Sequence, residues 1–568
     1  MKKQIFLGSD NFEAIIREKC CYIDKTDLIS KMFENKAGVY LFTRPRRFGK
    51  SLNMSMLRHF FSLNSDKSLF DGLKISENKE LCEKYQNQYP VIFVTLKDIS
   101  DSNFEQAYRD FARKIGFIAE EFNFLSKSDK LNDDEKKLYN QLKSLILGKI
   151  DDIRLETNLI KQSINILSRL LYKHYGKKTI VLIDEYDVPL NQAFSHGFYD
   201  KMIGLIRGFY DNAFKSNEYL ELAVLTGCLR ISKESIFTGL NNLVVYTVAE
   251  SDYSNCFGFT VEEVKELFDY YGISERFDDA KKWYDGYRIG GYEIFTPWDI
   301  LNFAQRAKND INTRAASFWT DTSSNDIIEN LLAIADEETK TDIENLISGG
   351  SITKKLNHNI VYNKLYSKID NVWAIMLSAG YLTILDTDAD GNSVLAIPNR
   401  EIKEVYEDKI NLWFKQNVRN QKDSLLKLQQ AFLTGDAETV ENLLNHFFKT
   451  TISVRDSMGD LNAKESFYHG VILGLLSGSN EYVVRSNREA GDGYYDICVL
   501  TTDEEIGIVL ELKAAQNENM DKTCDNALKQ IDDKRYAEIF DPEFIRHVYK
   551  YGIAFKRKRC KVKMATDN

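Results

Sequence analysis

Two groups of residues in this chain of 568 residues have types and spacing suited to phosphate chemistry. A phosphate loop reads G-x-x-x-x-G-K-[ST], and in the first group the last three positions fit while Arg44 replaces the first Gly. Gly49 lets the backbone approach phosphates, and the amide groups of a following helix attract anions. Lys50 would then reach the β- and γ-phosphates, and the Ser51 hydroxyl would ligate Mg²⁺. The string is Arg44-Pro45-Arg46-Arg47-Phe48-Gly49-Lys50-Ser51.

The two arginines before Phe48 have two interpretations. Arg46 and Arg47 add positive charge where a triphosphate would lie, or they are solvated side chains that touch nothing. The whole string also has an alternative, a basic turn between a strand and a helix. An apolar stretch at 39–43 precedes it and helical apolar spacing follows at 51–61, which favours a phosphate loop with all residues of 46–51 at the nucleotide.

A second apolar stretch, at 179–183, ends in two adjacent carboxylates, Asp184 and Glu185. In phosphate-loop enzymes such an Asp helps to hold Mg²⁺. Glu185 would polarise the attacking water and act as the catalytic base. The alternative is a turn or helix N-cap after a buried strand, which Asp also favours. The order along the chain, with Lys50 and Ser51 upstream, favours the catalytic interpretation.

A third polar strand end lies at Thr226, four residues before Arg230. Thr226 is in a position to sense the γ-phosphate. Arg230 is a candidate to stabilise charge in the transition state, within its own chain or in a neighbouring subunit, so a homo-oligomer stays open. A Thr at a strand end and an Arg paired with an acid explain the pattern equally well.

The second group lies near the C-terminus and contains Asp496, Glu511 and Lys513. Strand period two puts Glu511 and Lys513 on one face. The polar turn 501–505 predicts a hairpin that brings Asp496 beside Glu511. Two carboxylates so close are costly unless a cation such as Mg²⁺ or Mn²⁺ bridges them. Lys513 would then activate water or stabilise a pentavalent phosphate, whereas the alternative is a solvated strand face.

Two further polar residues flank this second group. Glu465 on a preceding helix and Gln530 on a following one are expected to support the site. His469 is more often structural than a ligand. The basic segment 556–561 is either an edge that contacts phosphate or a solvated stretch.

The elements that must position these residues follow from apolar periodicity. Buried strands at 39–43, 91–96, 179–183 and 222–225 alternate with helical stretches, which predicts a parallel α/β sheet. The pattern is mostly helical from about residue 260. It becomes a compact α/β module of about a hundred residues from about 462.

Composition narrows the class of protein. The net charge of −10 gives no global attraction to nucleic acid, so any such contact needs local basic patches. The eight cysteines form no CxxC pair, which indicates neither a zinc site nor a disulfide framework. No apolar run reaches the ~18 residues of a membrane span. The N-terminus lacks an apolar core of signal-peptide length, and we expect a cytoplasmic protein without a membrane contact.

Several strings together resemble the bacterial AAA-ATPase-like family, whose members commonly end in a PD-(D/E)xK nuclease-superfamily domain. The strings that carry the resemblance are Tyr22–Thr26, Leu41–Ser51, Ile183–Asp187, Thr226-Gly227 with Arg230–Ser235, and Trp283–Tyr287. The segments around Glu465, Asp496, Glu511–Lys513 and Gln530–Tyr536 resemble the nuclease domain. The missing first Gly of the phosphate loop is a habit of the family.

The resemblance implies an additional-strand P-loop NTPase core at 1–260, a helical or winged-helix-like lid and connector at 261–450, and a restriction-endonuclease-like α/β domain at 451–568. It implies ATP and Mg²⁺ as cofactors, with Mn²⁺ as an option at the nuclease site. Our first hypothesis is an ATPase coupled to a metal-dependent nuclease that acts on DNA or RNA. The alternative is a nucleotide-gated switch whose nuclease-like end recognises nucleic acid or a protein without cleavage. The residues Trp283–Tyr287 have no predicted role beyond a turn packed by aromatics.

Overall fold

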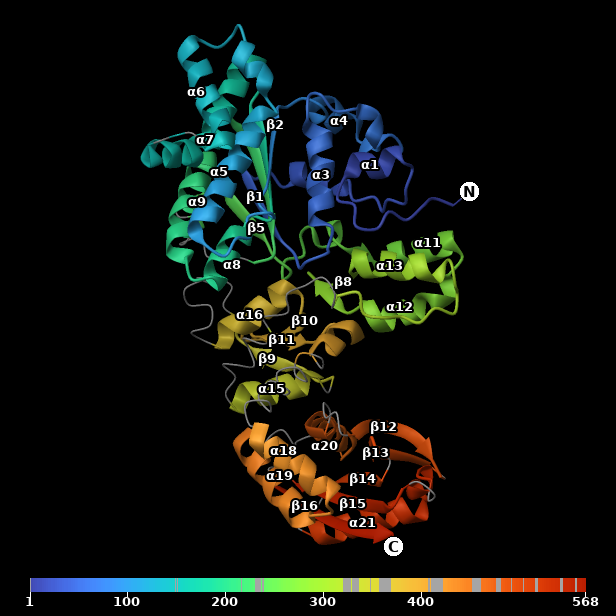
Figure 1. The fold of residues 1–568 in the computed structure, drawn as a ribbon. Coiled ribbons are helices and arrows are strands. Elements are labelled where there is room, and N and C mark those ends of the chain that lie inside the picture. Colours follow the sequence, from blue (N-terminus) through green and yellow to red (C-terminus); the bar gives the residue numbers. More distant parts are fainter. Residues whose placement is uncertain are drawn as a thin grey trace. The chain divides into compact units, whose positions relative to one another are not determined.

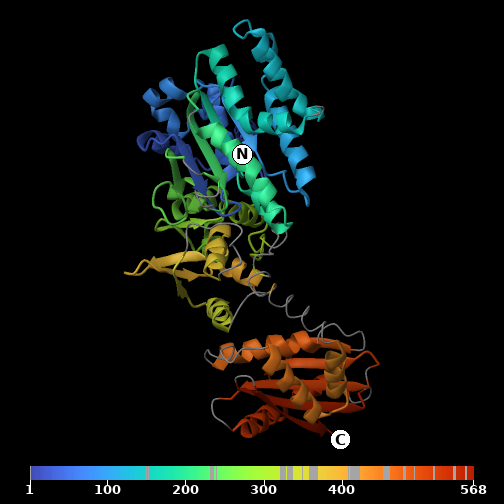
Figure 2. The same ribbon diagram turned by 90° about the vertical axis from the view of Figure 1, so that its left-hand side faces the viewer.

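A computed structural model shows the fold (Figures 1 and 2). The chain divides into two compact units, which are described separately below. Unit 1 comprises residues 1–323 and 353–403, and unit 2 comprises 324–352 and 404–568. The structure describes residues 2–148, 150, 152–215, 217–229, 236–237, 240–319, 328, 337–347, 349–356, 369–406, 409, 422–451, 461–476, 482–491, 493–503, 505–515, 519–541, 545–556 and 559–567.

Unit 1 is built on a five-stranded parallel sheet in the order β2-β3-β4-β1-β5. Its strands are β1 (Val39–Thr43), β2 (Val91–Thr95), β3 (Thr179–Asp184), β4 (Leu220–Gly227) and β5 (Leu243–Tyr246). The predicted parallel α/β sheet is therefore confirmed. The short strand β5 was not among the four predicted strands, because a four-residue edge strand has too little periodicity to identify.

Helices cover both faces of this sheet (Figure 1). The helix α3 (Lys50–Phe61) lies on one face, and α5 (Phe104–Glu120), α7 (Ile153–Tyr175) and α9 (Tyr199–Phe214) lie on the other. Apolar strands such as β1 and β3, buried at every residue, are expected for a sheet that is covered twice. The shorter helices of this part are α1 (Phe12–Arg17), α2 (Asp27–Glu34), α4 (Lys79–Tyr85), α6 (Asp133–Ser144) and α8 (Val188–Ser195).

The rest of unit 1 mixes helices with short strands. Three helices and a three-stranded sheet in the order β6-β8-β7 share one apolar core. They are α11 (Val261–Tyr271), α12 (Phe277–Tyr284), α13 (Pro297–Ala307), β6 (Phe259–Thr260), β7 (Tyr287–Ile289) and β8 (Tyr292–Phe295). The helix α16 (Ile369–Ala379) and the hairpin β10 (Thr383–Thr387) and β11 (Ser393–Ala396) follow. The strand β9 (Ile352–Lys354), most of which lies in unit 1, joins these two strands in a three-stranded sheet in the order β10-β11-β9. The helix α15 (Glu337–Ile347) belongs to unit 2.

The C-terminal part of unit 2 holds a five-stranded sheet in the order β12-β13-β14-β15-β16. The pair β14–β15 is parallel, and the other neighbours are antiparallel. The predicted hairpin is present as β13 (Gly493–Thr501) and β14 (Ile506–Ala514). The remaining elements are α20 (Leu461–Leu476), β12 (Tyr482–Ala490), α21 (Met520–Asp533), β15 (His547–Lys556) and β16 (Arg559–Asp567), of which β12 and β16 were not predicted.

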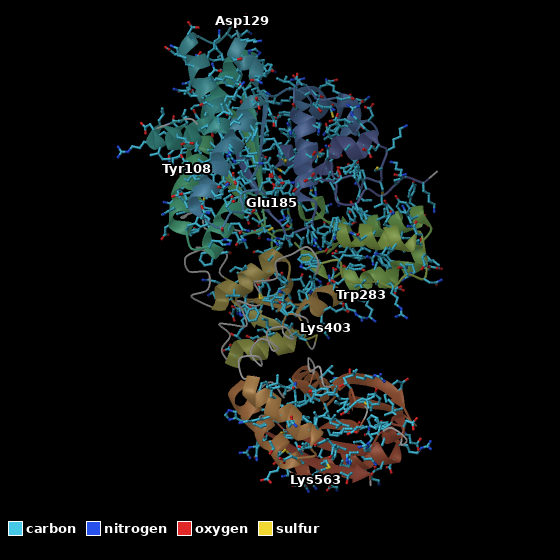
Figure 3. The ribbon with its side chains drawn as sticks, viewed as in Figure 1. Tyr108, Asp129, Glu185, Trp283, Lys403 and Lys563 are labelled. Carbon is cyan, nitrogen blue, oxygen red and sulfur yellow. The ribbon has the colours of Figure 1, made fainter. Side chains whose placement is uncertain are left out.

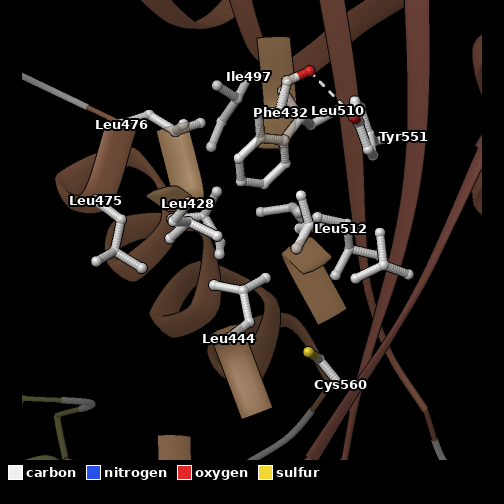
Figure 4. Close-up of a cluster of buried hydrophobic side chains, with 14 of the residues drawn as sticks. Leu428, Phe432, Leu444, Leu475, Leu476, Ile497, Leu510, Leu512, Tyr551 and Cys560 are labelled. Carbon is white, nitrogen blue, oxygen red and sulfur yellow. Dashed lines mark hydrogen bonds between the residues drawn. The ribbon is translucent and has the colours of Figure 1, made fainter. Parts of the chain in front are cut away.

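Two helices from the predicted connector complete the core of this sheet. The helices α18 (Lys422–Leu433) and α19 (Ala437–Thr451) pack with α20 on one sheet face (Figure 4). Leu428, Phe432 and Leu444 are among the buried side chains that they contribute. The compact body therefore extends N-terminal of residue 451, the expected start of the C-terminal domain.

Across the residues that the structure describes, no helix combines the length and the apolarity that crossing a membrane requires.

Replacing Leu428 by Ala tests whether α18 belongs to the same cooperative core as the sheet. Leu428 is buried, so the change should destabilise that core by about 2–5 kcal/mol. Leu426 lies two residues away on the same helix and is 54% exposed, so Leu426→Ala should cost less than about 0.5 kcal/mol. Hydrogen exchange of the β14 and β15 amides measures both effects. Equal exchange rates of the β14 and β15 amides in the two variants would show that α18 is not part of this cooperative core.

Candidate functional site

Three adjacent strands of the unit 1 sheet end at one edge. The strand β4 pairs with β1 on one side and with β3 on the other. Because parallel strands share one direction, their carboxyl ends lie at the same edge, where ligands of open α/β sheets commonly bind. This topology brings Lys50 after β1, Asp184 at the end of β3 and Thr226 near the end of β4 to one place.

The turn between β1 and α3 has the features of an anion cradle. Gly49 has φ of 78°, a left-handed conformation that glycine adopts without strain, and no atom lies within 4 Å of the Cβ position that it leaves open. The helix α3 begins directly after Gly49, and no side chain caps its first turn. Its first N–H groups and its dipole suit a phosphate. The residues present thus fit a nucleotide phosphate.

The Lys50 side chain is folded into this turn. Its ammonium donates to the carbonyl oxygens of Arg44 at 3.0 Å and Pro45 at 2.8 Å, and it lies 3.4 Å from the Cys228 sulfur. Lys50 is buried, so three contacts to polar atoms compensate for the loss of water around its charge. The contact with Cys228, just after β4, shows that the loop and the β4 end are close.

Arg44, which stands where a phosphate loop usually has its first Gly, is fully buried. Its guanidinium donates to the carbonyl oxygens of Thr43, Tyr246 and Thr247 and lies over the Phe257 ring. Burial lowers the pKa of Arg44 to about 10. Arg44 therefore links the loop to the end of β5. The sequence motif did not predict this role, because it showed only that Arg44 replaces the first Gly.

The next three residues of the loop have different surroundings. Arg46 is exposed. The Arg47 guanidinium donates to the Phe318 carbonyl oxygen at 2.8 Å, so it is neither solvated nor free of contacts. Phe48 is buried and packs edge-on against Tyr287 at 5.1 Å between ring centroids. The sequence treated these three residues alike, but the structure turns only Arg46 to solvent.

The carboxylate at the end of β3 is bonded directly to the end of β4. The Thr226 hydroxyl donates to Asp184 Oδ1 at 2.5 Å, and both residues are buried. The structure thus brings together Lys50, Asp184 and Thr226, three of the predicted nucleotide residues. Ser51 lies in the first turn of α3, next to Lys50.

Glu185 lies just past the end of β3 with φ of 54°, an uncommon conformation for a residue other than glycine (Figure 3). Burial raises the pKa of its carboxyl group, while the positive charge of Lys50 acts in the opposite direction. A raised pKa moves a carboxylate toward the range in which a general base works well near neutral pH. Strained backbone conformations recur at functional sites.

The Asp187 carboxylate contacts the backbone of the segment after β4. Its Oδ2 accepts the backbone N–H groups of Cys228 at 3.0 Å and Leu229 at 2.8 Å. The carboxylate therefore ties the segment after β3 to the segment after β4. Burial raises the pKa of Asp187. Arg230 follows Leu229 and lies outside the described residues.

In unit 2, the register of the hairpin places Glu511 and Lys513 on one face of the sheet. Cys498 of β13 pairs with Val509 of β14. Since side chains alternate along a strand, Glu511 and Lys513 share the face of Val509. The regular pairing of β13 with β14 ends at Ile497, and Asp496 reaches β14 through its side chain instead. The face also packs against α21, because Cys498 and Val509 share a buried cluster with Ile531 of that helix.

The contacts of these residues form a small polar network inside the sheet. Asp496 Oδ2 accepts the Leu512 backbone N–H at 2.7 Å, and the Lys513 ammonium donates to Glu511 Oε1 at 2.7 Å. Glu511 is 1% exposed. A buried carboxylate needs a cation or hydrogen bonds, so this chemistry fits a divalent cation with Lys513 beside it.

The flanking residues are placed as follows. Gln530 on α21 donates to the Tyr536 hydroxyl at 3.3 Å. His469 on α20 contacts the Asp496 carbonyl oxygen through Nε2 at 3.0 Å, a backbone contact. Glu465 lies on α20, and its side chain is outside the described part of the chain. Among described side chains, no three or more of His, Cys, Asp or Glu form a group placed to hold a metal ion.

Comparisons with known proteins identify both parts. Residues 6–237 match the family described as predicted AAA-ATPase, and residues 463–565 match the PD-(D/E)XK nuclease superfamily. The chain therefore combines an AAA-ATPase-like domain with a C-terminal domain of the PD-(D/E)XK nuclease superfamily, as the resemblance predicted. The chain is 24% identical to a protein of Azotobacter chroococcum mcd 1 named "Uncharacterized protein in vnfD 5'region". The alignment covers 98% of this chain and 97% of that protein. No solved structure matches the chain.

Replacing Thr226 by Val tests the bond between β3 and β4. Val keeps the shape but leaves the buried Asp184 carboxylate without this donor, so unit 1 should lose about 1–3 kcal/mol of stability. The matched control is Thr95→Val on the neighbouring strand β2, because the buried Thr95 hydroxyl has no hydrogen-bond partner. Hydrogen exchange of the β3 and β4 amides measures both variants. A control as costly as Thr226→Val would contradict the assignment.

Proposed function

We propose that the chain binds and hydrolyses ATP, and that this controls a metal-dependent phosphodiesterase that acts on nucleic acid. The observation that carries the proposal is the meeting of Lys50, Asp184 and Thr226 at the ends of three adjacent strands, where Asp184 accepts from Thr226 at 2.5 Å. ATP hydrolysis at a phosphate loop requires this arrangement, in which Lys50 belongs to the loop, Asp184 is the buried carboxylate that would bind Mg²⁺, and Thr226 is the polar sensor. The AAA-ATPase-like domain agrees with it.

The proposed roles at the nucleotide follow from these positions. The backbone at Gly49 and the start of α3 hold the phosphates, and the Lys50 ammonium neutralises their charge. Ser51 and Asp184 hold Mg²⁺, which supplies further charge stabilisation when bound. Glu185 orients the attacking water and accepts its proton.

Three more residues complete the proposed nucleotide site. Thr226, already bonded to Asp184, reports the γ-phosphate to the end of β4. Arg46 is exposed at the loop and adds positive charge. Arg230, the next residue after the segment that Asp187 holds, is proposed to stabilise the transition state within the chain or in a second copy.

In unit 2 the proposed roles rest on the buried hairpin face. Asp496 and Glu511 hold the divalent cation, which supplies an activated water when bound. Lys513 stabilises charge that develops on the scissile phosphate. Glu465 and Gln530 are proposed to orient these groups, and nucleic acid is the proposed substrate because the domain belongs to a nuclease superfamily.

The eight cysteines have free thiols. Free thiols are typical of proteins from a reducing compartment, which supports the proposal that this protein acts in the cytoplasm.

Glu185→Gln should separate ATP binding from hydrolysis. The amide keeps the size of the side chain but cannot accept the proton, so turnover should fall by roughly 10²-fold while affinity stays within a few-fold. Because burial raises the pKa of Glu185, wild-type hydrolysis should increase with pH above the usual range of a glutamate. The variant should lack that increase. Phosphate release from pH 4.5 to 8.5 measures both.

Lys50→Ala should weaken ATP binding itself, in contrast to Glu185→Gln. Loss of a charge-assisted phosphate contact should weaken ATP binding by about 1.5–3 kcal/mol, measured by equilibrium dialysis. The exposed Lys36 just before β1 gives a matched change, and Lys36→Ala should bind as wild type does. If the Lys50 and Lys36 variants bind ATP with equal affinity, Lys50 does not contact the phosphates. If the wild-type protein binds ATP but does not hydrolyse it, the alternative function as a nucleotide sensor would be supported instead.

Asp496→Asn and Glu511→Gln should each abolish cleavage of nucleic acid by removing a charge that holds the cation. Both changes preserve size, so the hairpin should remain folded. Lys513→Met should also abolish cleavage but should retain most of the cation binding. The assay offers double-stranded DNA, single-stranded DNA and RNA with Mg²⁺ or Mn²⁺, with and without ATP.

Asp503→Asn on the exposed turn of the same hairpin is the matched control and should cut as wild type does. Cleavage that survives Asp496→Asn would exclude the proposed cation site. Wild type that binds nucleic acid in all conditions without cutting it would instead support a recognition module gated by nucleotide.

A further inference from the structure

Arg47 lies in the phosphate loop, yet its side chain points into the protein. Its guanidinium donates to the Phe318 carbonyl oxygen at 2.8 Å and lies over two indole rings. The distances to the ring centroids are 5.1 Å for Trp319 and 5.6 Å for Trp298. The side chain is 12% exposed. A planar cation stacked between aromatic rings is held firmly, since Arg loses little further freedom in such a site.

Two buried carboxyl groups complete the surroundings of Arg47. Asp299 and Glu401 are each 1% exposed. Asp299 Oδ1 lies 4.0 Å from the Arg47 guanidinium, and Glu401 accepts the backbone N–H of Trp319 at 2.9 Å. Burial raises the pKa of both carboxyl groups, and the positive charge of Arg47 opposes this effect. Moving Arg47 would therefore take the nearby positive charge away from both carboxyl groups and favour their protonated forms further.

The backbone of Arg47 is also unusual, with φ of 68°. A left-handed conformation costs a residue other than glycine of order 1–3 kcal/mol and persists where the surroundings impose it. The contacts with Phe318, Trp298 and Trp319 supply that constraint. Arg47 therefore fixes the loop three residues before Lys50.

Binding of phosphate is expected to change this loop. Lys50 donates to the carbonyl oxygens of Arg44 and Pro45, within its own loop. The same ammonium is the donor that a phosphate would need, so a bound nucleotide competes with these two contacts. A shift of the loop backbone between Arg44 and Lys50 acts directly on Arg47, which lies between them.

The signature Trp283–Tyr287, which had no predicted role, forms the adjacent wall. Tyr287 packs against Phe48 of the loop, and its hydroxyl donates to the Gly380 carbonyl oxygen at 2.9 Å. Gly286 has φ of 97°, and a Cβ there would lie 1.8 Å from the Pro398 carbonyl oxygen. Only glycine fits this contact. The signature thus joins the loop to the segment that carries Glu401, three residues after Pro398.

We propose that Arg47 is a positioning residue that couples the conformation of the phosphate loop to the cluster of Trp298, Asp299, Phe318, Trp319 and Glu401, here called the arginine pocket. The proposal rests on the proposed ATP binding. Arg47 acts through the loop and through this pocket, and it does not contact phosphate. Occupancy of the nucleotide site then changes the environment of both tryptophans in the pocket.

Tryptophan fluorescence measures this coupling, because the stacked guanidinium touches two of the five tryptophans of the chain. ATP with Mg²⁺ should change the emission of wild type. The combined variant Trp298→Phe and Trp319→Phe should lose at least about half of that change. Trp283→Phe is the matched control, because Trp283 stacks on Arg400 instead, and it should keep the change.

Arg47→Ala and Glu401→Gln separate positioning from contact with phosphate. At saturating ATP, confirmed by dialysis, Arg47→Ala should bind nucleotide but lose the fluorescence change, and Arg47→Lys should restore part of it. Glu401 is buried and lies in another segment of the chain. A weaker ATP affinity of Glu401→Gln would therefore report coupling between the arginine pocket and the nucleotide site. The effects of Arg47→Ala and Glu401→Gln on affinity should be less than additive in the double variant, as expected for groups in one network.

Two results would overturn the proposal while ATP binding stands. One is an Arg47→Ala variant with the full fluorescence change at saturation. The other is a loss of affinity in Arg47→Ala that is fully additive with Glu401→Gln, which shows that Arg47 affects ATP binding independently of Glu401. Failure of wild type to bind ATP in the dialysis step is a separate outcome, and it overturns the proposed function together with the coupling. Unfolding of variants is excluded by far-ultraviolet circular dichroism.

Discussion

The turn between β1 and α3 holds two residues with positive φ, Arg47 at 68° and Gly49 at 78°. Glycine adopts this conformation freely, but arginine does not. The surrounding structure compensates for it from two sides. Arg44 bonds to carbonyl oxygens at the end of β5, and Arg47 stacks on Trp298 and Trp319. The loop is therefore shaped by its anchors, and the proposed binding of phosphate depends on them.

Unit 1 places charge inside the protein in several connected places. Arg44 is buried among carbonyl groups, and Asp184 is buried with Thr226. Asp299 and Glu401 are buried around Arg47. An isolated buried charge is very costly, so Arg44, Asp184 and Arg47 have partners, whereas burial favours the protonated forms of Asp299 and Glu401. Such linked groups respond together, which explains why a change at the phosphate loop is expected to reach residues about 350 positions away in the sequence.

The C-terminal domain uses the same physical arrangement at a second site. Glu511 is buried in the middle of β14, and its charge is balanced by Lys513, two residues along the same strand. Asp496 reaches across from β13 to the Leu512 N–H. The helices α18, α19 and α20 cover one face of this sheet, so Glu511 and Lys513 lie on the other face, which α21 covers. Packing on one face thus determines where chemistry can occur.

The sequence by itself determined the local features. Apolar runs at β1, β3, β13 and β14 defined the strands, because side-chain alternation and burial are encoded in short segments. Their polar ends identified the residues that could do chemistry, including Asp184, Glu511 and Lys513.

Only the tertiary structure decided what those residues contact, since contacts join segments that are far apart in the chain. The motif grouped Arg46 with Arg47, yet Arg46 faces solvent while Arg47 turns inward to Phe318, 271 residues away. The partner of Arg44 at β5, the packing of α18 on the C-terminal sheet and the wall formed by Trp283–Tyr287 depend equally on long-range packing. No local pattern encodes which distant carbonyl oxygen a buried guanidinium will meet, because that choice is made when the separate layers pack together.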